Sequence, residues 1–256
     1  MYTQEELEEA KEFLRRRLDS ERSMRRDVER LLEVYAAILL DLYLQNIGND
    51  DISVLIDGLI AALLEDCHTL GVDERTDKRI DILSYMDSEL GGDTLEGRIN
   101  KRCHTFADEV AVVATAGILL HKTRNDILAS IVGNFKHPYD NELLKEVRTE
   151  IEEGRVSYDY HYFDSPHYGS GTEISSMGAL QTITSFAVAD AWMDWQYHDA
   201  VDRGAKGYYV LRGSSYPCEE CDSHTGIFYP IDDNDSKPQY HLNCCCIVVY
   251  SYVERV

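Results

Sequence analysis

The residues with the clearest capacity for chemistry are cysteines and one histidine. Five of the seven cysteines in the 256-residue sequence lie between Cys218 and Cys246. Cys218 and Cys221 form a Cys-x-x-Cys pair, and after 19 further residues His241, Cys244 and Cys246 form a His-x-x-Cys-x-Cys cluster. Zinc binds four thiolate or imidazole ligands tetrahedrally, and two groups of donors separated by a loop supply such a set. The pattern therefore predicts a zinc site.

More donors are present than one zinc ion needs. The preferred set joins the first pair to the first two donors of the second cluster: Cys218, Cys221, His241 and Cys244. Cys246 is the expected substitute for one of them. Alternation along a strand would place Cys244 and Cys246 on one face and Cys245 on the other. A site closed by four protein ligands stabilises a fold and leaves no position for a substrate, so we expect a structural metal and no catalytic residue.

Three other interpretations of these cysteines stay open. A redox pair of the thioredoxin type would place Cys218 and Cys221 at the N-terminus of a helix that follows a strand, although Glu219 and Glu220 would raise the thiol pKa values. A disulfide could join the two clusters after cell lysis or release, or the thiols could simply be buried. An odd number of cysteines without a secretory signal is not typical of a disulfide framework. We therefore favour the metal.

Charge and hydropathy exclude several classes of protein. The formal net charge is −22, from 47 acidic and 25 basic side chains, whereas a main role in nucleic-acid binding needs clustered lysines and arginines. A hydrophobic content of 44% is that of a globular chain. No apolar run approaches the roughly 18 residues of a membrane helix, and the charged N-terminal segment is unlike a signal peptide. We expect a soluble protein made in the cytoplasm, with no membrane partner.

Helices must supply most of the framework, because all five prolines follow residue 137 and the first half has helical periodicity. Helices are predicted over 4–45 (with a candidate break near Ser20), 52–70, 76–90, 94–121, 124–135, 141–153 and 172–203. The Tyr- and His-rich stretch 156–171 is predicted to be extended or a long loop. Strands are predicted over 207–212 and 247–253. The expected fold class is α+β: a mostly α-helical N-terminal and middle part with a small β-containing, zinc-stabilised C-terminal module.

The residues around the cysteines carry a resemblance to a known family. The segment from Gly213 to Cys221 reads GSSYPCEEC, and Gly226, Phe228, Pro238 and the run HLNCCC from His241 to Cys246 follow it. This arrangement resembles the signature of the phage Mu F-like minor head proteins, also called head morphogenesis proteins. Two positions depart from the family pattern, because Leu242 replaces a proline and Cys245 replaces an arginine. The resemblance covers the last third of the chain well, extends loosely to 107–131, and does not reach residues before about 90.

The resemblance implies a structural minor capsid protein of a tailed phage or prophage. Such a protein is associated with the portal and the capsid interior and assists head assembly or genome delivery. It would be located in the virion, in the capsid interior or at the portal vertex, and in the host cytoplasm during assembly. Its partners would be a portal or capsid protein, with at most weak contact with packaged DNA. We expect a helical, partner-binding region over 1–90, a helical middle region over 91–155 and the Mu F-like module over 156–256.

Two further function classes stay open. A toxin-like enzyme domain would place its chemistry in the Tyr-rich stretch, which holds Asp159, His161, Asp164 and His167. No nucleophile motif or phosphate-binding loop accompanies these residues, so we expect no enzyme. A thiol-redox protein would use Cys218 and Cys221.

The first predicted helix also carries a basic run. Seven arginines lie between Arg15 and Arg30 and could meet DNA or an acidic portal surface. We favour a solvated helix face, in which Glu12 pairs with Arg16 and Glu21 with Arg25 at i, i+4 spacing.

Overall fold

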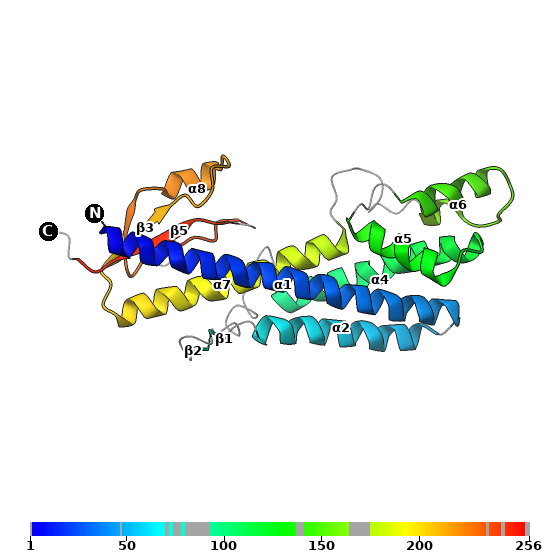
Figure 1. Ribbon diagram of the computed structural model, residues 1–256, viewed down its shortest axis with the longest axis horizontal. Coiled ribbons are helices and arrows are strands. Elements are labelled where there is room, and N and C mark those ends of the chain that lie inside the picture. The colour runs from blue at the N-terminus through cyan, green and yellow to red at the C-terminus, as the bar shows by residue number, and fades with distance from the viewer. Residues whose placement is uncertain are drawn as a thin grey trace. The chain divides into compact units, whose positions relative to one another are not determined.

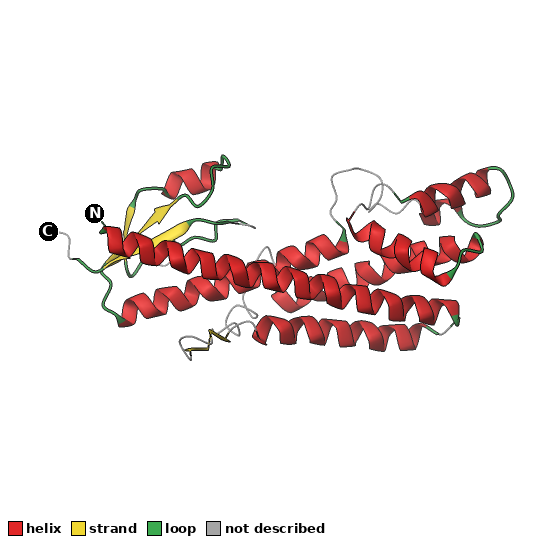
Figure 2. Cartoon of the chain, in the orientation of Figure 1, coloured by secondary structure: helices red, strands yellow, loops and turns green. Residues whose placement is uncertain are grey.

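The computed structural model describes residues 2–46, 48–69, 72–73, 78–79, 93–136, 141–163, 175–233, 236–241 and 244–253. Helices dominate the described chain, and one three-stranded antiparallel sheet accompanies them (Figures 1 and 2). The chain forms two compact units. The first consists of Met1–Met24, Cys67–Ser88 and Thr184–Val256, and the second of Arg25–Asp66 and Glu89–Ile183. This division differs from the three consecutive regions expected, because the start of the chain groups with its C-terminal part.

The second unit is helical. It contains the later turns of α1 (Gln4–Leu44), most of α2 (Asn49–Thr69), then α4 (Leu95–Leu119), α5 (Arg124–Lys136), α6 (Glu142–Glu152), the 3₁₀ helix η1 (Tyr160–Phe163) and the first turns of α7 (Ser176–Asp202). Leucines at helical spacing are fully buried in its core, and Phe106 packs on Phe135 with ring centroids 5.4 Å apart. Burial of this apolar stripe stabilises the unit.

Polar groups define the helix ends in this unit. Thr94 and Asn141 are N-caps, and their side chains accept hydrogen bonds from the backbone N–H groups of Gly97 and Leu144. These bonds satisfy donors that have no partner within the helix. Glu109, buried in α4, accepts a 3.0 Å hydrogen bond from the backbone N–H of Ser176, the first residue of α7. A carboxylate at this end of a helix is favoured by the helix dipole.

The first unit is built around a sheet with the strand order β4–β3–β5. The central strand β3 (Gly207–Leu211) pairs antiparallel with β4 (Phe228–Pro230) and with β5 (Ile247–Ser251). Tyr209 and Val249 on one face of the sheet form a buried cluster with Ala10 of α1. Phe13 of α1 packs against Trp192 and Trp195 of α7 with centroid distances of 5.6 and 5.8 Å. The sheet and the end of α7 are thus anchored on the first turns of α1.

Most predicted elements are confirmed, with boundaries shifted by a few residues. α1 runs without the candidate break near Ser20. The helix expected over 76–90 is wrong at Lys78–Arg79, where β2 pairs with β1 (Val72–Asp73), and the rest of that range lies outside the described residues. The stretch expected to be extended contains η1, and its part from residue 164 lies outside the described residues. Neither β4 nor the short helix α8 (Glu219–His224) was expected from the sequence.

No helix among the described residues combines the length and the apolar character required to cross a membrane.

Candidate metal centre

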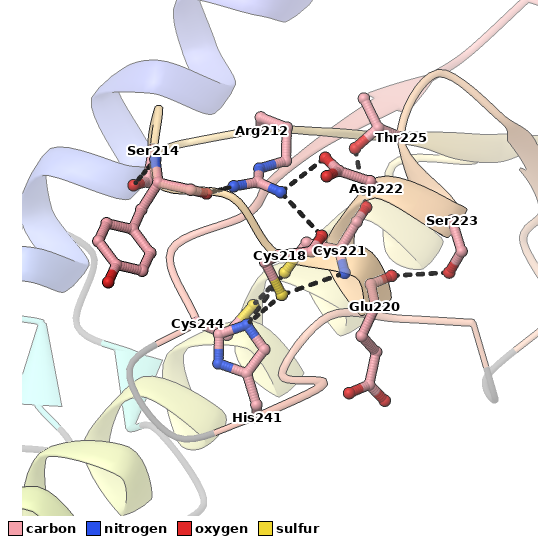
Figure 3. A network of polar contacts seen from close by, with 11 residues as sticks. Arg212, Ser214, Cys218, Glu220, Cys221, Asp222, Ser223, Thr225, His241 and Cys244 are labelled. Carbon is pink, nitrogen blue, oxygen red and sulfur yellow. Dashed lines mark hydrogen bonds and ion pairs between the residues drawn. The ribbon is translucent and has the colours of Figure 1, made fainter.

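The antiparallel pairing of β3 with β5 brings the two cysteine clusters together. Leu211, at the end of β3, is the register partner of Ile247, at the start of β5. The loop that follows β3 therefore lies beside the residues that precede β5. Cys218 ends this loop as the N-cap of α8, and Cys221 lies in the first turn of that helix. Figure 3 shows the Cys218 and Cys221 thiols facing the His241 ring and Cys244.

Five donor atoms gather there in two overlapping groups. Cys218, Cys221 and His241 form one group, and Cys221, Cys244 and Cys246 form the other, with the donor atoms of each group within 4.8 Å of one another. The His241 Nε2 atom lies 3.2 Å from the Cys218 sulfur and 3.1 Å from the Cys221 sulfur. The Cys221 and Cys244 sulfurs are 3.9 Å apart. All five residues predicted as ligands are therefore brought together, and Cys221 belongs to both groups.

These distances fit the chemistry of a metal ion with soft ligands. Bond lengths of about 2.3 Å for zinc–sulfur and about 2.0 Å for zinc–nitrogen place tetrahedral ligands about 3.5 to 3.8 Å apart. The observed spacings of 3.1 to 3.9 Å lie near that range. A disulfide would need sulfurs about 2.05 Å apart, and no disulfide joins any of the seven cysteines, all of which are among the described residues. The Cys/His cluster could therefore hold a metal ion.

Burial distinguishes the three neighbouring cysteines of the second cluster. Cys244 and Cys246 are buried, whereas Cys245 between them is half-exposed and belongs to neither donor group. This alternation agrees with the one expected along a strand, although β5 begins only at Ile247. A cavity of about 280 Å³ adjoins the site, and its wall includes Cys218, His241 and Cys245. Donor residues of both cysteine clusters therefore line one cavity.

Arg212, one residue beyond β3, holds the first half of the site. Its guanidinium donates to the Cys218 carbonyl at 3.1 Å and pairs with the Asp222 carboxylate at 2.6 Å, and it also donates to the Tyr216 carbonyl (Figure 3). The Thr225 hydroxyl donates to the Cys221 carbonyl at 2.8 Å. These contacts fix the turn that carries the first two sulfurs.

Arg17, on α1, holds the second half. Its guanidinium donates to the Cys244 carbonyl at 3.1 Å, and its Nε atom lies 3.2 Å from the Glu21 carboxylate. Only 1% of Arg17 is exposed, so the expectation of a solvated arginine face is wrong at this position. Exposed arginines of the run also pair with acidic neighbours, as Arg15 does with Glu12 and Arg22 with Asp19.

Gly213 allows the two halves to approach each other. A Cβ atom at this position would lie 1.7 Å from the Cys245 carbonyl oxygen. No side chain can be accommodated at that distance from backbone, so the close approach depends on glycine. The residue belongs to the segment that carries the family resemblance, although that resemblance assigned it no role.

The thiol pKa values differ within the cluster. The Cys221 backbone N–H donates to the Cys218 sulfur and lowers the pKa of that thiol, with a further contribution from His241. Hydrogen bonds from the Cys246 thiol, acting against burial, lower the pKa of Cys244 to about 5. Burial raises the pKa of Cys221 to about 12. One thiol in each half thus has a lowered pKa and loses its proton more readily than a free cysteine does, and the thiolate is the form that binds metals.

Part of the redox interpretation also agrees with the structure. Cys218 is the N-cap of a helix after a strand, as a redox pair requires, but α8 has only six residues. The expected rise in pKa is wrong for Cys218 and correct in direction for Cys221, where burial is the largest cause. The short distance from both sulfurs to His241 is the feature that a metal site explains and a redox pair does not require.

The Tyr-rich stretch offers no comparable site among its described residues. The backbone N–H of His161 donates to the Asp159 carboxylate at 3.0 Å, which is a local turn contact. Asp164 and His167 lie outside the described residues.

Comparison with models of protein families, with curated proteins and with solved structures finds no match to this chain.

Proposed function

We propose that this chain is a structural protein whose first unit is held together by one zinc ion. The observation that carries the proposal is the convergence of three sulfur donors and the His241 ring from two segments that a loop separates. A set of three cysteines and one histidine is a common composition of structural zinc sites. Cys218, Cys221 and His241 would provide three ligands, and Cys244 the fourth, with Cys246 as its substitute.

The zinc would link the loop after β3 to the segment before β5. It would cross-link these two segments and offset most of the negative charge of the thiolates. The chain's own residues orient the donors, since Arg212 holds the Cys218 carbonyl and Arg17 holds the Cys244 carbonyl. Four protein ligands would complete the coordination of the ion, so the proposed role is structural and not catalytic.

Metal content tests this proposal directly. Protein purified without chelators is expected to contain about one zinc ion per chain. Cys221→Ser should lose the metal, because Cys221 belongs to both donor groups. Cys245→Ser is the matched control, since that thiol lies next to the site but outside both groups, and it should retain the metal. Wild-type protein that binds no zinc at equilibrium would overturn the proposal.

Separate variants decide the fourth ligand. Cys244→Ser and Cys246→Ser should differ in zinc affinity, and the larger loss should fall on Cys244. A cobalt-loaded protein reports the number of bound thiolates through its sulfur-to-metal absorption. Equal retention of zinc by both single variants would show that neither sulfur is individually required as the fourth ligand.

We further propose that the chain serves as a minor head protein of a tailed phage or prophage. The cysteines and the histidine of the motif that resembles the Mu F-like signature are the residues that gather at the candidate metal centre. The net charge of −22 favours contacts with protein rather than with packaged DNA. We therefore expect the partner to be a portal or capsid protein, and contact with DNA to be weak.

Imaging of purified phage heads tests this role. The chain, carrying a small tag, is expected inside the capsid or at the portal vertex of particles from the phage or prophage that encodes it. If the chain is found in the host cytoplasm but is absent from the purified heads, the assignment to the virion is refuted. This outcome is independent of whether the chain binds zinc.

A thiol-redox function is the second candidate. The observation in its favour is the position of Cys218 at the N-terminus of α8, with a lowered pKa. Metal-free protein should then catalyse disulfide reduction, and Cys218→Ser should abolish the turnover. Absence of turnover in the metal-free wild-type protein would eliminate this candidate.

A further inference from the structure

Arg17 is the largest fully buried side chain among the described residues, although it belongs to a helix that is rich in charged residues. Removing a guanidinium from water is unfavourable unless opposite charges and hydrogen-bond acceptors surround it. Two partners are found. The Glu21 carboxylate lies 3.2 Å from Nε, and the Cys244 carbonyl accepts a hydrogen bond of 3.1 Å. Arg17 therefore contacts the backbone of a candidate metal ligand that lies 227 residues away in the sequence.

The other half of the centre has an equivalent contact. Arg212 donates to the carbonyl of Cys218, the first cysteine of its pair, as Arg17 does to the carbonyl of Cys244. The two arginines differ in environment, because the Arg212 side chain is 20% exposed and is paired with the exposed Asp222, whereas Arg17 is almost completely buried. The second half of the centre therefore depends on a charged group supplied by α1.

Charge makes the location of Arg17 significant. A zinc ion with three thiolates and one neutral histidine carries a net charge of −1. The ion pair with Glu21 is neutral overall, so the pair by itself does not compensate that charge. The guanidinium nevertheless lies next to the proposed metal centre, because it donates a hydrogen bond to the carbonyl of Cys244. It is placed to stabilise a negative metal–thiolate centre electrostatically in a poorly solvated environment.

We infer that Arg17 is a positioning residue of the metal centre, and that metal binding and the docking of the first turns of α1 are thermodynamically coupled. The inference rests on the proposed zinc site. Arg17 fixes the Cys244 carbonyl and thereby holds the segment that carries Cys244 and Cys246 in place. By reciprocity, an ion that orders this segment also stabilises the contact with α1. The N-terminal turns of α1 therefore belong to the metal-binding module.

The alternative is that Arg17 and Glu21 form a buried ion pair that only stabilises the fold. In that case, loss of Arg17 would lower the stability of the apo and the zinc-loaded protein equally. Coupling predicts instead that the loss of stability is larger in the presence of zinc. Metal affinity and metal-dependent protection of α1 are thus the readouts that distinguish the two roles.

The first experiment measures zinc affinity by competition with a chelator and follows cobalt loading by absorption. Arg17→Met keeps an unbranched, flexible side chain but removes the guanidinium group and its charge, and its affinity is expected to fall 10- to 100-fold, as is usual for groups that orient metal ligands. Arg17→Lys should recover part of this loss. Arg15→Met is the matched control, because Arg15 lies on the same helix, is 67% exposed and pairs only locally with Glu12. Arg15→Met should bind zinc like the wild type.

The second experiment needs no variant and therefore remains valid if Arg17→Met does not fold. Amide hydrogen exchange of the wild-type protein is compared with and without zinc. Protection is expected to increase in α8 and in the segment before β5, and also in α1 around Arg17. Increased protection limited to α8 and the segment before β5 would overturn the coupling.

The two proposals fail in different ways. Wild-type protein that binds no metal would refute the zinc site itself. If the wild-type protein binds zinc and Arg17→Met binds it with the same affinity and the same cobalt spectrum, only the proposed role of Arg17 is refuted. The zinc site itself would stand.

Discussion

Replacement of Gly213 by alanine is the sharpest test of the geometry of the candidate metal centre and of the proposed zinc site. The added Cβ would lie 1.7 Å from the Cys245 carbonyl oxygen. Carbon–oxygen contacts are normally no shorter than about 3.3 Å, so the two segments must separate by about 1.6 Å. Both contacting groups belong to backbone, which cannot rotate away as a flexible side chain would. The whole segment next to Cys245 must therefore move.

The consequence for the metal follows from the position of Cys245 between two donors. Ligand distances in a metal site tolerate changes of only about 0.2 Å, which is far less than the required shift. Either Cys244 or Cys246 must then leave its place, or the segment must rearrange at a cost in stability. We expect zinc affinity to fall by one to two powers of ten, which corresponds to about 1.4 to 2.8 kcal/mol.

The assay is a zinc competition titration combined with thermal unfolding of the apo and loaded forms. Gly133→Ala is the control, because a Cβ at Gly133 in α5 meets nothing within 4 Å. This control should bind zinc normally, and its free energy of unfolding should stay unchanged or rise by up to about 1 kcal/mol, as for alanine in a helix interior. A Gly213→Ala variant with the zinc affinity and cobalt spectrum of the wild type would refute the reasoning.

Three further substitutions test other parts of the structure. Burial raises the pKa of Asp190 to about 6. The contribution of this carboxyl group to stability is therefore present below about pH 4 and is lost as the pH rises through 6. Asp190→Asn should be more stable than the wild type at pH 7, by at most about 3 kcal/mol, and similar to it at pH 4. Parallel pH profiles of urea unfolding would contradict this. Glu109→Ala should destabilise the chain by about 1 to 3 kcal/mol in urea unfolding, because it removes the acceptor of the buried Ser176 groups, whereas Glu109→Gln should cost less. Gly117→Ala should lower the melting temperature, since its Cβ would lie 2.3 Å from the Ile127 side chain; an unchanged melting temperature would show that α4 and α5 separate without cost.

Local patterns in the sequence predicted the helices well. The apolar residues of α1 lie three or four positions apart, and such relations can be read directly from a sequence. The helices predicted from Thr94 and from Asn141 were placed to within one residue of their observed starts. The gathering of the metal donors was also expected, because thiol and imidazole groups have few other reasons to recur at this spacing. Short elements were missed: α8 and β4 contain too few residues to show a period.

The roles of Arg17 and Gly213 could not be predicted in the same way. Arg17 is one of seven arginines in a charged run, and only the position of Cys244 in space distinguishes it from its neighbours. Gly213 is required because of a carbonyl 32 positions later in the chain. Each role results from a contact between distant segments, and the sequence contains no local sign of either contact.

The contact between Arg17 and Cys244 also has a consequence for the order of folding during synthesis. The two residues are 227 positions apart, and a ribosome adding about 5 to 20 residues per second needs about 10 to 45 s to cover that distance. The second compact unit, which lies between them in the sequence, can collapse during this time, because its helices need only one another. The contacts of the first turns of α1 with the sheet and with Cys244 must wait for the last strand. Until then the apolar side chains that make these contacts are exposed, and they are available to proteins that bind nascent chains.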